Sequence, residues 1–253
     1  MSNWVGSFHL FRREATRFRK IMVDTVISPV VSNLLYLIIF NIAVSGRDIN
    51  GISYIQFLAP GLIAMTLINS SFSNPSFALV ISKFAGTISD ILIAPLTGAQ
   101  IVLAYVGAAM VRAIITAFAT LLVILIFTHL EIYSIPLALL SAFITSFFFG
   151  TIGVIFGYFA KQFDNLTLMT TFIMTPMSFL GGVFYPVSNL TEPWRTISLF
   201  NPLLYFIDFF RFSVLGVYFI EPKISFSVGI LSILIVFPLA IFLFSKGKRL
   251  TLL

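Results

Sequence analysis

Charged side chains inside long apolar stretches are the groups of this chain that could do chemistry. Arg112 lies within an otherwise uncharged apolar run, and Asp208 and Arg211 lie three residues apart in another apolar segment. Residues at that spacing share one face of a helix, so Asp208 and Arg211 can pair, and an Arg112 inside a membrane can contact an anionic headgroup. The alternatives are a solvated surface pair at Asp208 and Arg211, and an Arg112 near the cytoplasmic end of its helix whose charge reaches the surface.

Patterns of catalytic or metal-binding sites are missing from the sequence. It contains no G-x-x-x-x-G-K-[ST] phosphate loop, no H-E-x-x-H and no G-x-S-x-G. It has no cysteine, and its two histidines, His9 and His129, are far apart, so no metal site is expected. We therefore expect a non-catalytic protein without a cofactor of its own. If it moves a solute, the energy must come from elsewhere.

The composition is that of an integral membrane protein. Of the 253 residues, 59% are hydrophobic and only 9% are charged, whereas a soluble domain carries about 25% charged residues. Because lipid cannot hydrogen-bond to the backbone, runs of this kind cross a bilayer as helices. The expected fold class is an all-α membrane protein, and the net charge of +6 indicates orientation in a membrane, not nucleic-acid binding.

Six apolar runs are long enough to cross a bilayer, which needs about 20 residues. They are residues 25–45, 52–82, 101–127, 137–160, 166–184 and 226–245. A rival count of seven makes residues 91–111 a crossing of its own. Within the fourth run, Gly153 and Gly157 form a GxxxG pattern, which packs two helices closely either within one subunit or between two.

The basic residues indicate the orientation of the six crossings. The proposed cytoplasmic segments carry Arg12, Arg13, Arg17, Arg19, Lys20, Lys83, Lys161, Lys246, Lys248 and Arg249. The proposed external segments carry only Arg47, Arg195, Arg211 and Lys223. Because positive residues concentrate on the cytoplasmic side, both termini are expected to be cytoplasmic.

Residues 1–24 are expected to form an amphipathic helix in the plane of the membrane surface. Trp4, Phe8, Phe11 and Phe18 can share one broad face, with the arginines along the rest of the helix. Such a helix directs its cations toward anionic lipid headgroups, so membrane lipids are expected partners. A nucleic-acid-binding tail is the weaker alternative, because the aromatic residues recur at helical spacing.

Residues 83–100 are expected to hold a short cytoplasmic helix. Gly86 breaks the preceding run, and Thr87 to Asp90 fits the [ST]-x-x-[DE] pattern of a helix start. Pro95 and Gly98 would end the helix after about two turns. With apolar residues on one side, it suits a groove in a partner protein. The alternative is a helix that lies on the bilayer surface.

Residues 179–211 are expected to end the fifth crossing and turn back into the membrane. Gly181 and Gly182 break the helix, Pro186 prevents a straight continuation, and the apolar run 197–207 is too short to cross. Irregular backbone at membrane depth is tolerated only where protein buries it or water lines it. We therefore interpret residues 185–225 as an external re-entrant region and a candidate gate.

The order GGxFxP, a short polar segment with Trp, and then NPLLYFIDFFR resembles the membrane permeases of type-2 ABC exporters, over nearly the whole chain. The resemblance implies a homodimer in a bacterial inner membrane that moves an amphipathic, lipid, drug or glycan substrate outward. It also implies a separate ATPase subunit that binds ATP and Mg. In that family the short helix in residues 83–100 would couple to the ATPase. The residues expected at this contact are Gly86, Thr87, Ile88, Asp90, Ile91 and Leu92. The external gate would include Gly181, Gly182, Phe184, Pro186, Asp208 and Arg211.

Two other classes remain open from the sequence. An ion-coupled secondary carrier should have Asp, Glu or His within its crossings, and none is convincing here. A non-transporting assembly factor or anchor would need neither a coupling helix nor a re-entrant gate. A copurified ATPase would discriminate among the three classes.

Labelling of single cysteines with an impermeant thiol reagent tests the six-crossing topology on this cysteine-free background. We expect labelling from outside for the variants Asp48→Cys, Tyr133→Cys and Thr191→Cys. We expect protection for the variants Ser89→Cys, Phe163→Cys and Lys248→Cys. External labelling at position 248 with position 89 protected would contradict the six-crossing topology.

Overall fold

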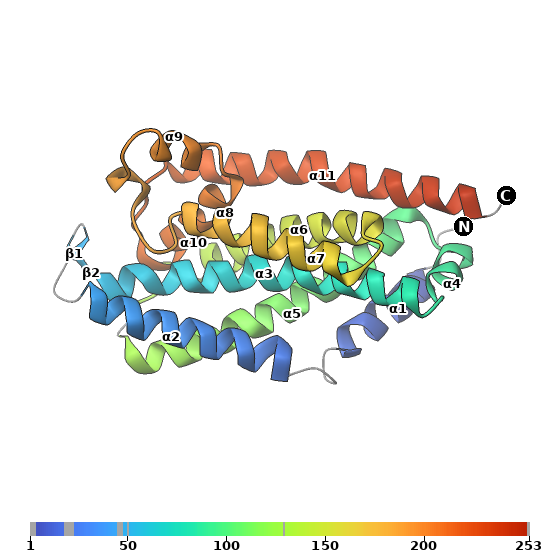
Figure 1. The fold of residues 1–253 in the computed structure, drawn as a ribbon, viewed down its shortest axis with the longest axis horizontal. Helices are drawn as coiled ribbons and strands as arrows, with labels where there is room; N and C mark the ends of the chain where they lie inside the picture. Colours follow the sequence, from blue (N-terminus) through green and yellow to red (C-terminus); the bar gives the residue numbers. More distant parts are fainter. Residues whose placement is uncertain (1–3, 18–22, 45–47, 50, 129, 252–253) are drawn as a thin grey trace.

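The computed structural model describes residues 4–17, 23–44, 48–49, 51–128 and 130–251, which form an elongated bundle of helices (Figure 1). The β hairpin and α9 lie at one end of the bundle, and α1, α4 and the end of α11 lie at the other (Figure 1). The elements in chain order are α1 (Trp4–Arg17), η2 (Val23–Ile27), α2 (Ser28–Ala43), β1 (Asp48–Ile49), β2 (Ile52–Ser53), α3 (Tyr54–Phe84), α4 (Ile88–Ile93), α5 (Gly98–Phe127), α6 (Ile135–Phe159), α7 (Phe163–Met169), η3 (Thr170–Met174), α8 (Thr175–Leu180), η4 (Val187–Asn189), α9 (Trp194–Leu199), α10 (Pro202–Leu215) and α11 (Pro222–Thr251).

Among the described residues, five helices are long and apolar enough to cross a membrane. They are Thr25–Ala43, Tyr54–Phe84, Gly98–Phe127, Ile135–Phe159 and Pro222–Gly247. They correspond to the first, second, third, fourth and sixth expected crossings, with ends shifted by a few residues. The rival crossing 91–111 is not one helix, because the chain is irregular between α4 and α5 and a capping box of Thr97 and Gln100 starts α5 afresh.

The fifth expected crossing, residues 166–184, corresponds to a helical run that is broken into α7, η3 and α8 and is not among those five. The middle of this run, η3, is π-helical, and Thr175 Oγ1 donates to the carbonyl of Thr170 over 2.9 Å. Pro176 follows directly, and a proline ring clashes with the carbonyl four residues before it in an α-helix. A wide π turn at this place fits that constraint.

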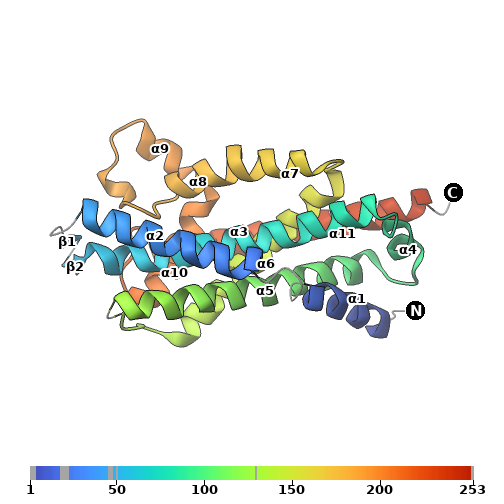
Figure 2. The ribbon, with the colours of Figure 1, turned by 60° about the horizontal axis from the view of Figure 1, so that its bottom comes forward.

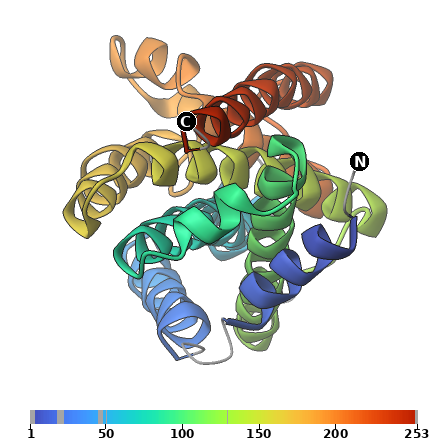
Figure 3. The same cartoon turned by 90° about the vertical axis from the view of Figure 1, so that its right-hand side faces the viewer.

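Helix α3 is the most buried and the least apolar of the five long helices. In its most apolar window 83% of residues are buried and the mean hydropathy is 1.4, against 11% and 2.7 for α11. Viewed along the bundle, α3 lies in the interior, and α2 and α11 lie at the periphery (Figure 3). In lipid, polar side chains are best placed against protein, so the helix that carries them occupies the centre.

Helix α1 packs along the first half of α5 with a mixed face, on which Leu10 is buried in an apolar cluster with residues of α5 (Figure 2). Ser7 is buried there and donates to the carbonyl of Gln100 over 3.1 Å, and Glu14 is buried as well. Trp4 and Phe8 are exposed. Of the residues expected in this interfacial helix, Phe18, Arg19 and Lys20 lie outside the described residues.

Glycines on α6 allow close approach to α3. A Cβ at Gly153 would collide with the carbonyl oxygen of Phe72, and a Cβ at Gly157 would lie 3.0 Å from Cα of Ser76. Ser76 Oγ also donates to the carbonyl of Gly153 over 2.9 Å. The GxxxG pattern therefore packs two helices of the same chain, which was the simpler interpretation of the sequence.

Substitution of these glycines tests the contact between α3 and α6. Gly153→Ala should destabilise the folded protein by roughly 1–3 kcal/mol, because backbone atoms of α3 cannot move away from the new methyl group. Gly150→Ala is the matched control, since its Cβ would meet its nearest neighbour at an ordinary 3.5 Å. Thermal denaturation of the purified variants in detergent measures the difference. Equal stability of the two variants would contradict the packing described.

Candidate functional site

Arg211 is the centre of a buried polar network at the hairpin end of the bundle. Its side chain is 1% exposed, and Nη2 donates to the carbonyl of Gly182 over 2.8 Å. Nε donates to the carbonyl of Phe57 over 3.4 Å, and the guanidinium lies 4.2 Å from the centre of the Phe57 ring. One side chain of α10 thus holds both the Gly-Gly turn and the start of α3.

Asp208 holds a different segment of the same region. Its carboxylate accepts hydrogen bonds from the backbone N–H groups of Phe219 and Ile220, at 3.1 and 2.8 Å. Arg211 Nη1 lies 3.9 Å from Asp208 Oδ1, and the Asp208 side chain is also 1% exposed. The interpretation as a solvated surface pair is therefore wrong, since both charges are buried and each is also compensated by main-chain groups.

Local sequence explains why α10 carries these residues here. Asn201 caps α10 by accepting from the N–H of Leu203 over 3.0 Å, and Pro202 occupies the first turn. Asn201 Nδ2 also donates to the carbonyl of Met177 on α8 over 2.6 Å. The cap therefore fixes α10 against the end of the broken fifth helix.

The Gly-Gly turn and the residues after it pack into the same region. Gly182 has φ of +75°, which favours glycine, and a Cβ at Gly181 would lie 2.8 Å from Cδ1 of Ile207. Phe184 is 4% exposed and its ring contacts aromatic rings of α2, while its carbonyl accepts from Tyr54 Oη over 2.9 Å. Pro186, two residues further on, is buried as well. The residues expected at the gate therefore lie together.

At the opposite end of the bundle, α4 has the expected place and length but a different start. Thr87 is the residue before α4, yet its side chain makes no capping bond and instead donates to the carbonyl of Ser82 over 3.3 Å. Asp90 and Gly86 are exposed, and the backbone of Gly86 has a positive φ of +71°. The expected capping pattern is thus absent, because Thr87 bonds backward to α3.

The apolar residues of α4 face the chain itself. Ile91 is 5% exposed and belongs to an apolar cluster with Leu10 of α1, against which Ile88 and Leu92 also pack. Ile93, by contrast, is 60% exposed. A sequence cannot distinguish an apolar residue that meets a partner from one that meets its own core, and here Ile93 is the apolar side chain of α4 that is free to meet a partner.

Lys83, which sequence analysis treated only as a positive charge, caps α6. Its ammonium group donates to the carbonyls of Gly157, Tyr158 and Ala160, at 2.9, 2.6 and 2.8 Å. Cations are favourable at the C-terminal end of a helix, where carbonyls lack partners. The contact joins the end of α3, just before α4, to the end of α6.

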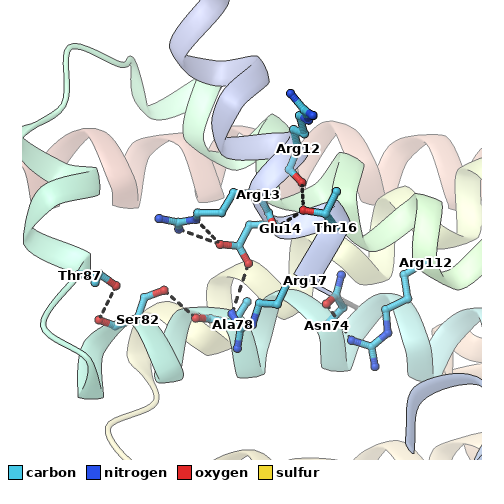
Figure 4. Close-up of polar contacts among 10 residues, drawn as sticks. All are labelled: Arg12, Arg13, Glu14, Thr16, Arg17, Asn74, Ala78, Ser82, Thr87 and Arg112. Atoms are coloured by element: carbon cyan, nitrogen blue, oxygen red, sulfur yellow. Dashed lines mark hydrogen bonds and ion pairs between the residues drawn. The ribbon is translucent and has the colours of Figure 1, made fainter. Parts of the chain in front are cut away.

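Glu14 of α1 lies beside this region, between two arginines of its own helix (Figure 4). Its carboxylate is 2.7 Å from Arg13 Nη2 and 3.4 Å from Arg17 Nη1. Burial alone would lower the pKa of the Arg13 guanidinium, but the hydrogen bond and the charge of Glu14 outweigh it, and the pKa is raised. A cavity of about 280 Å³ separates α1 from α4 here.

Arg112 lies midway along α5, so the interpretation that it sits near the end of its helix is wrong. Its Nη1 donates to Oδ1 of Asn74 on α3 over 2.9 Å (Figure 4). It borders a cavity of about 350 Å³ between α2, α3 and α5, whose lining is rich in Ser, Thr and Asn. The structure thus separates Arg112 from both the Arg211 network and the Lys83 cap.

Metal ligands do not gather anywhere in the described part of the chain: no group of three or more His, Cys, Asp or Glu residues could hold an ion.

Residues 7–215 match the ABC-2 type transporter family, and the chain belongs to that family. It is 32% identical over 249 residues to the inner membrane transport permease YadH of Escherichia coli K12, covering 98% of this chain and 97% of YadH. It is 26% identical over 246 residues to nodulation protein J of Rhizobium leguminosarum bv. viciae, covering 93% and 90%. The chain is accordingly a multi-pass transport permease of the bacterial inner membrane, and its family implies a partner ATPase.

A double-mutant cycle tests the Arg211 network. Removing one member of a buried, hydrogen-bonded pair leaves an uncompensated charge and typically costs about 3–5 kcal/mol, so Asp208→Ala and Arg211→Ala should each destabilise the protein strongly. The double variant should lose less than the sum, because neither charge is then left alone. Thermal denaturation in detergent measures all three, with the exposed Arg195→Ala as the control. Strict additivity would mean that the two charges do not interact.

Proposed function

We propose that this permease is the membrane half of an ATP-driven exporter, in which two copies of the chain assemble with two ATPase subunits. The ATPase would bind ATP and Mg, and this chain would carry no cofactor. In this proposal residues 163–180 form the fifth of six membrane crossings, both termini are cytoplasmic, and α9 with α10 re-enters the bilayer from outside. Substrate would pass outward between the two copies.

The observation that carries the proposal is the continuity of α3. Its 31 residues span about 46 Å at 1.5 Å per residue and connect the α4 region to the Arg211 network without a break. At one end Lys83 joins α3 to α6, and at the other Tyr54 and Phe57 bond to Phe184 and Arg211. A displacement at α4 would therefore reach the Gly-Gly turn through one continuous helix, in which Pro60 and Pro75 lie.

Close contact at the external end supports the same proposal. A Cβ at Gly61 would lie 2.8 Å from the carbonyl oxygen of Val183 and 2.9 Å from Arg211 Nη2. The loop after the fifth helix therefore rests directly on α3. A rotation or shift of α3 cannot leave that loop in place, which is what an external gate controlled from the cytoplasm requires.

The two rival classes fit the observations less well. The five long helices contain no Asp, Glu or His, so they offer no acidic or imidazole group to carry a coupling proton or ion. An anchor or assembly factor would have no use for a polar intramembrane cavity or for buried charges at one end. The class of substrate, an amphipathic lipid, drug or glycan, follows the family.

Substitution on the exposed face of α4 tests the coupling. Ile93→Asp should leave the permease folded but abolish copurification of its coexpressed ATPase, because a charge replaces the apolar side chain that meets the partner. Ile132→Asp at the opposite end of the bundle, also exposed, should retain the ATPase. Ile91→Asp should instead reduce the yield of folded protein, since Ile91 is part of the chain's own core. Full ATPase binding by folded Ile93→Asp would refute this face as the coupling surface.

A further inference from the structure

The cavity between α2, α3 and α5 is polar although it lies among membrane-crossing helices. It has a volume of about 350 Å³, and it is lined by Ser28 and Ser32 of α2, Asn69 and Ser73 of α3, and Arg112 of α5. A void of this size holds several water molecules or one headgroup, whereas cavities that stay empty are apolar. Its polarity therefore indicates that it is occupied by something polar.

The polar groups of the cavity lack partners within the described part of the chain. Neighbouring Asn33 and Thr66 satisfy each other through a short hydrogen bond. The side chains of Ser28, Ser32, Asn69 and Ser73 make no such bond to any described residue. Ser28 and Ser32 are exposed and Asn69 and Ser73 are half-buried, so their polar groups are accessible to a ligand or water that enters the cavity.

Arg112 supplies a positive charge that no described acidic side chain neutralises. Its one hydrogen bond goes to the amide oxygen of Asn74, and its Nε is buried without a partner among the described residues. Arg17 at the end of α1, which is ion-paired with Glu14 over 3.4 Å, is a second positive charge in this region (Figure 4). A guanidinium offers parallel N–H donors that match a phosphate group.

We propose that this cavity binds the phosphate ester headgroup of an amphiphile, with the phosphate on Arg112, whose guanidinium is oriented by Asn74, and its neighbouring hydroxyl or amide groups on the serines and Asn69. The apolar tail remains in the surrounding lipid. The assignment rests on the proposed function, because it makes this headgroup part of the transported substrate. The same phosphate chemistry could come from a resident anionic lipid, which the experiment separates.

Direct binding to the full-length permease, purified without ATPase in a neutral maltoside detergent, tests the site. The probe is radiolabelled dodecyl phosphate, and saturable binding with one probe per chain is expected. Arg112→Gln should weaken binding at least tenfold, and Arg112→Lys should weaken it less, because the charge remains without the paired donors. Arg195→Gln, on the exposed external segment, is the matched control and should bind as the parent does.

A second variant tests the same site in case Arg112→Gln loses binding only because it misfolds. Asn69→Ala with Ser73→Ala leaves the charge in place and should weaken binding severalfold in a monodisperse protein. Unlabelled inorganic phosphate should compete poorly and dodecyl maltoside not at all. Unchanged binding in Arg112→Gln, or equal competition by inorganic phosphate, would overturn the assignment.

The last measurement separates a substrate from a resident lipid. In the reconstituted complex with ATPase, dodecyl phosphate should raise ATP hydrolysis severalfold. Arg112→Gln should remove that stimulation, whereas the control Arg195→Gln should keep both the stimulation and the basal hydrolysis. Binding at Arg112 without stimulation would overturn the substrate role in favour of a resident lipid. If no ATPase associates with the permease but binding still depends on Arg112, the proposed function fails while the headgroup site stands.

Discussion

The buried guanidinium of Arg211 is the interaction on which the hairpin end of the molecule depends. A charge at this depth is tolerated only with full compensation, and Arg211 obtains it from the carbonyls of Gly182 and Phe57, the Phe57 ring and the nearby Asp208. These groups belong to three separate segments. Because none can move without exposing a charge or a carbonyl, the Gly-Gly turn, α10 and the start of α3 form one unit.

Helix α3 extends this constraint through the bundle. It is the least apolar long helix and the most buried, the arrangement expected where lipid is the outer solvent. Glycines on α6 allow this helix to pack closely against α3. At the far end of the pair, the ammonium group of Lys83 donates hydrogen bonds to the last carbonyls of α6. The packing thus makes α3 and α6 a stiff pair between the two ends of the molecule.

The polar cavity beside Arg112 differs from the Arg211 network, because its polar groups are not bonded to one another. Around Arg211 the polar groups bond to one another and leave little capacity for a ligand. Around Arg112 the serines, Asn69 and one guanidinium nitrogen remain open. Satisfied groups make an anchor, and unsatisfied groups next to a void make a binding site. The two arginines, similar in the sequence, therefore have different roles.

The sequence by itself determined the membrane class, five long helices and the break at Gly181 and Gly182, because these depend on local apolar runs and on backbone preferences. The family came from the resemblance of the stretch that runs from GGxFxP to NPLLYFIDFFR. It also put Asp208 and Arg211 on one helix face. Only the tertiary structure decided that Arg211 bonds to Phe57, 154 residues away, and that Lys83 caps a helix 74 residues further on. It also decided that Ile91 faces inward and Ile93 outward. Such pairings depend on which helices become neighbours, and residue type and spacing along one chain segment carry no information about that choice.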